Sequence, residues 1–185
     1  MPCLCHKGGY TDLSKKNIYK GRIVDLNIEQ VRLPNGKNIE LEVIHHSGAS
    51  AIVPLKDNGQ VVLIKQFRYA AGGFIYEIPA GRLHKGEDPA ACAARELEEE
   101  VGYKTGRLEK LITILTTPGF CDERIHIFMA RDLIQTEQRL DPDEVLEIVE
   151  MPLDEAIRGI RDGIINDAKT IAGLSVVYFR IRGQS

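Results

Sequence analysis

Six carboxylates and a single base, Arg95, lie within one short stretch, EDPAACAARELEEE. Glu96, Glu99 and Glu100 follow the i, i+3, i+4 spacing that places side chains together on one face of a helix. Like charges at this spacing repel, and the helix macrodipole disfavours anions near the C-terminal end. The cluster therefore requires a cation. Arg95 can neutralise one edge of it, and a hard divalent ion such as Mg²⁺ or Mn²⁺ can neutralise the rest, because such ions take oxygen ligands.

The element that must carry these glutamates is a helix over residues 89 to 101. Asp88 is a suitable N-cap, and a proline at the first helical position loses no hydrogen bond. Gly102 follows the last periodic residue, as a C-terminal cap does. The spacing also predicts one apolar stripe that packs on a sheet; it consists of Ala90, Ala94, Leu97 and Val101.

A strand expected at residues 74–78 leads into this helix through Pro79-Ala80-Gly81 and a glycine-containing loop. Its backbone carbonyls would face the same space as the glutamates. Strand, loop and acidic helix together indicate a pocket for cations. The competing interpretation is a solvated acidic surface, which is what a run of charges usually means. Glu98, on the far side of the helix, is expected to be solvated.

The remaining pattern predicts an α+β domain with a small β appendage in front of it. Alternating apolar residues on both sides of Pro34-Asn35-Gly36 predict a hairpin between Gly21 and Val43. Further strands are expected at 51–55, 61–66, 111–115, 125–130 and 145–151, with helices at about 153–161 and 167–181. We divide the chain into a loose leader (1–16), a small hairpin domain (17–47) and a main domain (48–185).

Bulk properties exclude several classes of protein. The chain has 185 residues and a formal net charge of −3, which gives no reason to expect a nucleic-acid or membrane surface. No apolar run approaches the roughly 20 residues of a membrane helix, and no signal-peptide pattern is present, so we expect a cytoplasmic protein.

The cysteines and histidines give little indication of metal binding or catalysis. Cys92 is expected to be a buried thiol within the helix. Cys3 and Cys5, with His6, lack enough partners for a zinc site and indicate a frayed terminus. The remaining histidines, His45 among them, are expected to be structural or exposed.

Residues 81 to 103 resemble the Nudix box, G-x5-E-x7-R-E-U-x-E-E-x-G-U, in which U is a bulky apolar residue. The matching positions are Gly81, Glu87, Arg95, Glu96, Leu97, Glu99, Glu100, Gly102 and Tyr103. Only the last departs from the pattern, since an aliphatic residue is more usual there. The resemblance implies the Nudix fold, a mixed sheet between helices, and metal-dependent hydrolysis of a pyrophosphate bond.

The same resemblance assigns roles by position. Glu96 and Glu100 would be the main ligands of Mg²⁺ or Mn²⁺, assisted by Glu99 and by the backbone carbonyl of Ala80. Arg95 and Glu87 would form an orienting pair that holds this face of the helix. The six positions to which the resemblance assigns a metal-binding or orienting role are Ala80, Glu87, Arg95, Glu96, Glu99 and Glu100.

Segments outside the box resemble the ADP-ribose and ADP-sugar pyrophosphatases of this family. They are LIKQFRYA, YEIPAG and TTPGFCDERIHIFMARDL, which contains Pro118. This likeness implies cleavage of ADP-ribose to AMP and ribose 5-phosphate by a homodimer that assembles through the front hairpin. It also implies substrate contacts from Arg68, Gly119 and Glu123, although a surface strand residue and a plain turn would explain these positions too.

The general base is expected in the acidic loop EQRLDPDEVLEI, where Asp141, Asp143 and Glu144 are in reach. Glu144 comes first, as base or further metal ligand, and Asp143 next, unless the loop is only an acidic surface. Rival functions remain at this stage. One is hydrolysis of GDP-mannose or another nucleoside diphosphate derivative. Another is a sensor that binds ADP-ribose without cleaving it, and a third is an acidic-helix interaction protein without metal. The intact box disfavours the last two.

Overall fold

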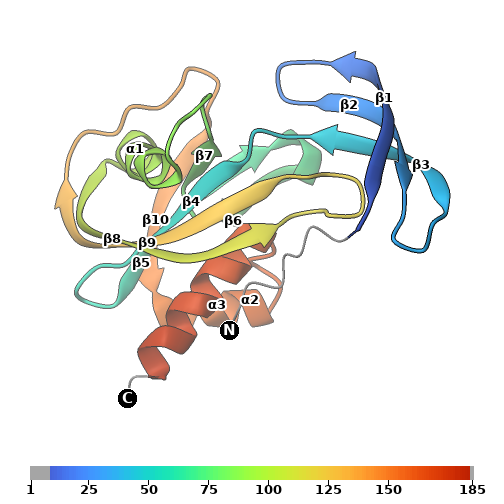
Figure 1. The fold of residues 1–185 in the computed structure, drawn as a ribbon. Helices are drawn as coiled ribbons and strands as arrows, with labels where there is room; N and C mark the ends of the chain where they lie inside the picture. The colour runs from blue at the N-terminus through green and yellow to red at the C-terminus, as the bar shows by residue number, and fades with distance from the viewer. Residues whose placement is uncertain (1–8, 184–185) are drawn as a thin grey trace. The chain divides into compact units, whose positions relative to one another are not determined.

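The computed structural model describes residues 9–183, which form two compact units (Figure 1). The first unit comprises the described residues up to His46 together with Leu115–Glu123. The second unit comprises Ser47–Ile114 and the chain from Arg124 onward. The predicted cluster of Cys3, Cys5 and His6 lies outside the described residues.

The first unit is an antiparallel sheet in the order β1-β2-β3. Its strands are β1 (Thr11–Lys20), β2 (Asp25–Arg32) and β3 (Asn38–His45). The predicted hairpin is confirmed, because β2 and β3 pair across a turn in which Gly36 has φ +82°. The prediction of a loose leader is wrong for residues 11–16, because they belong to β1, which pairs with β2. Backbone pairing holds this strand, and none of its side chains is buried, so no apolar pattern could reveal it.

The second unit contains two sheets. One is mixed, with the order β7-β4-β9-β8, in which β4 runs parallel to β9 and antiparallel to β7. The other is antiparallel, with the order β10-β5-β6. The strands are β4 (Ala49–Pro54), β5 (Gln60–Arg68), β6 (Gly73–Glu77), β7 (Ala80–Arg82), β8 (Tyr103–Leu115), β9 (Arg124–Gln135) and β10 (Leu146–Pro152). A 3-10 turn, Tyr69–Ala71, joins β5 to β6.

Three helices cover these sheets: α1 (Pro89–Val101), α2 (Leu153–Arg161) and α3 (Ala168–Arg182). Successive side chains of a strand point to opposite faces, and the cores follow that alternation. Ile52 and Val62 pack in the core that contains Leu97 of α1, whereas Val53 packs in the core that contains Leu174 of α3. The predicted α+β fold, with sheets between helices, is therefore confirmed, and Figure 1 shows α1 and α3 on opposite sides.

Helix α1 has the predicted bounds and caps. The Asp88 side chain accepts hydrogen bonds from the backbone N–H groups of Ala90 and Ala91, and Gly102 ends the helix in the left-handed conformation. Cys92 is buried, as predicted. No helix in the described part of the chain has the length and apolar character that crossing a membrane would require.

Candidate functional site

Two of the three clustered glutamates of α1 are buried. Glu96 is 7% exposed and Glu100 only 2%, whereas the Glu99 side chain is 40% exposed. A glutamate is rarely buried unless it has a partner, so this face of α1 is not a solvated acidic surface. Glu100 Oε2 accepts a hydrogen bond of 2.8 Å from the Ala80 N–H, which ties the end of α1 to the start of β7.

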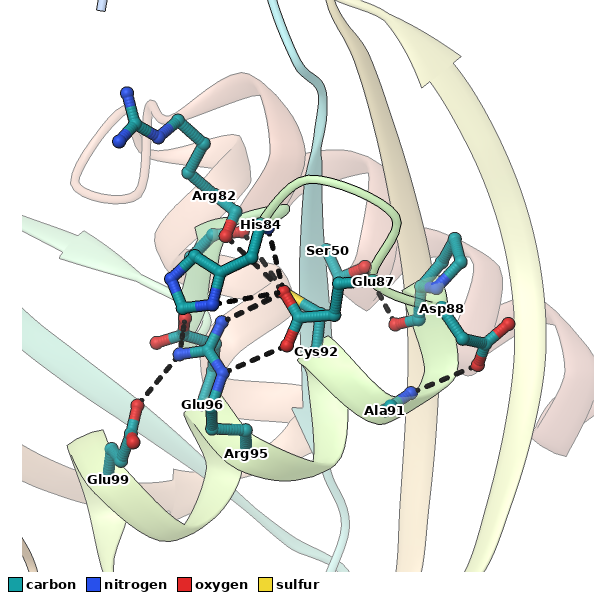
Figure 2. A network of polar contacts seen from close by, with 12 residues as sticks. Ser50, Arg82, His84, Glu87, Asp88, Ala91, Cys92, Arg95, Glu96 and Glu99 are labelled. Atoms are coloured by element: carbon teal, nitrogen blue, oxygen red, sulfur yellow. Dashed lines mark hydrogen bonds and ion pairs between the residues drawn. The ribbon is translucent and has the colours of Figure 1, made fainter. Parts of the chain in front are cut away.

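Arg95 bridges three carboxylates (Figure 2). Its Nη1 donates to Glu96 Oε1 at 2.6 Å and to Glu99 Oε2 at 2.8 Å, and its Nε donates to Glu87 Oε1 at 3.0 Å. The other oxygen of Glu87 accepts from the His84 N–H at 2.9 Å. The predicted pairing of Arg95 with Glu87 is thus present in the structure, and it fixes the loop before α1 to the helix.

The carboxylates of this cluster are electrostatically unequal. The hydrogen bond from Arg95, together with the one from the His84 N–H, lowers the pKa of Glu87 to about 2. Burial raises the pKa of Glu96 to about 7, and the charges of Glu99 and Glu144 act in the same direction against Arg95. Burial and the charge of Glu96 also raise the pKa of Glu100 well above its ordinary value. Arg95 therefore satisfies Glu87 but leaves Glu96 and Glu100 short of positive charge.

Gly81 makes room for this cluster. A Cβ atom at residue 81 would lie 1.7 Å from Glu96 Oε1 and 2.0 Å from Glu96 Cδ. Only glycine leaves the Glu96 carboxylate its place against β7. The first glycine of the sequence pattern therefore has a steric role at the carboxylates.

A cavity of about 220 Å³ opens beside the cluster. Its lining combines β7, the loop before α1, α1 itself and the acidic loop before β10. The lining residues are Ala80, Gly81, Arg82, His84, Arg95, Glu96, Glu99, Arg139, Asp141 and Glu144. Glu144, the expected base, is therefore brought to the same cavity as Glu96, whereas Asp143 is not among the lining residues. Sequence reasoning gave no role to Arg82 or Arg139, and it placed Asp141 in reach without preferring it.

The donor set suits a hard divalent cation. Within residues 9–183, no group of three or more His, Cys, Asp or Glu side chains is arranged to enclose a metal ion. Buried carboxylates that lack positive charge, with an open cavity beside them, instead fit an ion whose coordination is completed by waters and substrate phosphates, as is usual for Mg²⁺. The residues present thus fit a divalent metal that is shared with a phosphate-bearing substrate.

Arg68 belongs to a second polar network that sequence reasoning missed. Its Nε donates to Glu77 Oε2 at 2.7 Å, and the other oxygen of the buried Glu77 pairs with the buried Lys169. Asp167 contacts Lys169 Nζ at 3.1 Å and caps α3 through the Thr170 N–H. The Arg68 guanidinium is thereby held at the end of β5, and its charge partly offsets the rise in the pKa of Glu100. Glu77 and Lys169 lie 92 residues apart, so no local pattern links them.

Gly119 and Glu123 lie in the first unit. Glu123 Oε1 lies 3.2 Å from His46 Nδ1. Nothing within 4 Å would meet a Cβ atom at Gly119. Their predicted contacts with substrate stay predictions.

The family model described as the NUDIX domain matches residues 44–174. Among curated proteins, an ADP-ribose pyrophosphatase of Bacillus subtilis (strain 168) is 42% identical over 92% of this chain and 92% of its own length. A methanol dehydrogenase activator of Bacillus methanolicus is 40% identical over the same shares. A solved structure of an ADP compounds hydrolase superposes with a TM-score of 0.83, at 24% identity, over 95% of this chain and 96% of that one. That structure supports the fold.

Proposed function

Because this chain belongs to the Nudix family, we propose that it hydrolyses the pyrophosphate bond of ADP-ribose to give AMP and ribose 5-phosphate. One observation carries the proposal. Glu96 and Glu100 are both buried and short of positive charge, and Glu96 lines a cavity that Glu144 also lines. The choice of ADP-ribose draws on the likeness to the ADP-ribose pyrophosphatase of Bacillus subtilis.

Nudix hydrolases generally use divalent metal ions, and we assign Mg²⁺ here, with Mn²⁺ able to replace it. Glu96 and Glu100 would hold the ion, with help from Glu99 and the carbonyl of Ala80. When bound, the metal neutralises phosphate oxygens and acidifies a water molecule. Charge repulsion between the two anionic phosphoryl groups and a nucleophile makes such neutralisation necessary.

The chain's own residues supply positioning and proton transfer. Glu144 accepts a proton from the attacking water, whose oxygen forms a bond to one phosphorus. The bond from that phosphorus to the bridging oxygen breaks, and the other phosphate leaves with that oxygen. Arg95 and Glu87 keep the carboxylate face of α1 in place. Arg68, held by Glu77, contacts the nucleotide through phosphate or by stacking on the base. Gly119 and Glu123 contact the terminal ribose and its phosphate.

We assign a homodimer that assembles through the sheet of the first unit, which contains the predicted hairpin. Every side chain of β1 is exposed, and the large apolar ones are Leu13, Ile18 and Tyr19. Tyr10, just before the strand, and Leu41 of β3 are exposed as well. Apolar side chains gathered on one small sheet are typical of an interface. Light scattering coupled to gel filtration would give twice the mass of 20.7 kDa for a dimer. Cytoplasmic location and the absence of nucleic-acid and membrane partners stay predictions.

The test is a panel of nucleoside diphosphate compounds, ADP-ribose and GDP-mannose among them, assayed with and without Mg²⁺. Wild type would be compared with Glu100→Gln and with Glu155→Gln, a matched change at an exposed glutamate of α2. We expect wild type and Glu155→Gln to cleave ADP-ribose best and only with metal, and Glu100→Gln to lose most of the rate. Preference for GDP-mannose would overturn the substrate but not the chemistry. Binding of ADP-ribose without cleavage would favour a sensor.

A further inference from the structure

The C-terminal turn of α1 is covered by a short segment that follows β9. We call Thr136–Arg139 the strap. The last carbonyls of a helix have no hydrogen-bond partner within the helix itself. The strap supplies three hydrogen-bond donors to these carbonyls. The Thr136 N–H donates to the Gly102 carbonyl at 2.7 Å, and the Arg139 N–H donates to the Glu99 carbonyl at 2.9 Å. Gln138 Nε2 donates to the Glu100 carbonyl at 2.6 Å.

The strap also lies in close contact with Gly102. A Cβ atom at residue 102 would meet the Thr136 carbonyl oxygen at 3.0 Å and the Gln138 nitrogen at 3.1 Å. Gly102 has φ +67°, which already favours glycine. The glycine that ends α1 thus serves two purposes, because it closes the helix and admits the strap.

One ion pair links the strap's side chains to α1. Arg139 Nη2 donates to Glu98 Oε1 at 2.7 Å. The Lys104 ammonium lies 3.7 Å from the same oxygen. Glu98 is therefore not simply solvated, as the sequence suggested; its side chain is only 23% exposed and holds two bases. A pair at 41 residues' separation gives no signal in the sequence.

The strap contains the first residues of the acidic loop (137–148), and the loop turns immediately beyond the strap. Its turn is closed by two hydrogen bonds, from the Glu144 N–H to the Asp141 carbonyl at 3.0 Å and from the Asp141 N–H to Glu144 Oε2 at 3.1 Å. Asp141 is two residues beyond Arg139, and both Asp141 and Glu144 line the cavity that Glu96 lines. A fixed strap therefore fixes where the Glu144 carboxylate lies relative to α1.

We propose that Arg139 and Glu98 are positioning residues for hydrolysis: their ion pair holds the strap on α1 and so keeps Glu144 at the carboxylate cavity. This inference rests on the proposed function, in which Glu144 takes the proton of water. Arg139 lines the cavity, but the role proposed here does not depend on a contact with the reacting atoms. Arg139 acts through the strap, and Glu98 acts through Arg139.

The test compares Arg139→Met, Glu98→Gln, the double variant and Arg139→Lys. Methionine keeps the aliphatic stem and removes the charge. We expect each single variant to lower kcat for ADP-ribose about tenfold with little change in KM, since small displacements of a catalytic group are costly. The double variant is expected to be no worse than either single one, because both remove the same interaction. Arg139→Lys is expected to restore part of kcat.

Hydrogen exchange supplies a readout that does not depend on turnover. Loss of the ion pair should speed exchange of the Thr136 and Arg139 amides, which are bonded to α1. Lys104→Met is the matched control, because Lys104 pairs with the same Glu98 oxygen but lies outside the strap. It should leave both kcat and exchange of the strap unchanged.

The outcomes separate this inference from the proposed function. Absence of turnover by wild type would overturn the proposed function. Normal wild-type turnover with kcat of Arg139→Met within twofold of it would overturn only the positioning role, even if exchange became faster. Additive losses in the double variant would also overturn it, because Arg139 would then act independently of Glu98.

Discussion

Two carboxylate clusters in this molecule differ in how far nearby cations balance their negative charge. In the first unit, Glu29 and Asp122 lie on either side of His45, with Glu29 Oε1 at 2.7 Å from Nε2 and Asp122 Oδ2 at 2.6 Å from Nδ1. A neutral imidazole can donate through only one nitrogen, so this geometry favours the imidazolium. In the second unit, Arg95 is shared by Glu87, Glu96 and Glu99, and Glu96 and the buried Glu100 remain short of positive charge.

The pKa shifts record the same difference. His45 lowers the pKa of Glu29, and it lowers that of Asp122 against the effect of burial; Glu29 and then Asp122 raise the pKa of His45. On α1, burial raises the pKa of Glu96 and Glu100. A compensated cluster contributes to the fold. A cluster that is left uncompensated reduces the stability of the metal-free protein, and such perturbed groups are concentrated at functional sites.

The largest expected effect is that of Glu100→Gln. We expect kcat to fall about a thousandfold, the loss typical of removing one group that stabilises charge in the transition state. The metal-free protein should become more stable by about 1 kcal/mol near pH 8, because burial disfavours the ionised form of Glu100 and glutamine can still accept the Ala80 N–H. Urea unfolding in the presence of a chelator measures this.

Glu29→Gln provides the contrast, because the same chemical change is made in the compensated cluster. It should lower the free energy of unfolding by about 1 kcal/mol, discounted for the partial exposure of the pair. It should leave the affinity for Mg²⁺ unchanged. Destabilisation by both substitutions would remove the distinction between the two clusters.

Gly81→Ala tests the second cluster in another way, because it displaces the Glu96 carboxylate without removing it. The new Cβ atom would overlap Glu96 Oε1, so the side chain must leave its place against β7. We expect kcat to fall about a hundredfold, as misplacement of a catalytic group does, while the fold is retained because a side-chain end can shift. Gly73→Ala is the control, since nothing lies within 4 Å of a Cβ atom there. Equal rates for the two variants would argue against a role for the position of Glu96.

The smallest expected effect is that of His45→Gln, and it depends on pH. The raised pKa of His45 means that its stabilisation is complete below about pH 6.5 and is lost as the pH rises through the higher folded-state value. Because the pKa values of Glu29 and Asp122 are lowered, the stabilisation that these two carboxylates contribute is lost only in acid. Lys15, which lies 3.0 Å from Glu29 Oε1, opposes protonation of His45. His45→Gln should cost about 1 kcal/mol near pH 6 and less near pH 9; a cost that grew with pH would contradict this assignment.

The sequence predicted the elements that carry their own periodicity. Helix α1, with Asp88 and Gly102 at its ends, has the expected bounds, as does α2. The hairpin forms as predicted, but its strands run from Asp25 to His45 rather than from Gly21 to Val43. Sequence reasoning missed β1, whose side chains are all exposed, and β7, which has only three residues. Short or fully exposed strands are held by backbone pairing, which leaves no hydrophobic pattern.

The candidate site was predictable in its local part. The glutamates of α1, Arg95 and Glu87 follow from spacing and from the resemblance that the spacing carries. The supporting contacts were not predictable, because Arg139 with Glu98 and Lys169 with Glu77 join residues that are distant in the sequence. Such pairs depend on how the elements pack, so only a structure identifies them.

The most direct test of the central claim is calorimetric titration of the metal-free protein with Mg²⁺ near pH 6, in two buffers of different ionisation enthalpy. If Glu96 and Glu100 form the cation site, then metal must displace protons, because the pKa of Glu96 is about 7 and that of Glu100 is also raised. We expect wild type and Glu29→Gln to bind Mg²⁺ with proton release, and Glu100→Gln to lose most of the affinity. Binding without proton release, or undiminished binding by Glu100→Gln, would contradict the assignment of these buried glutamates as the metal site.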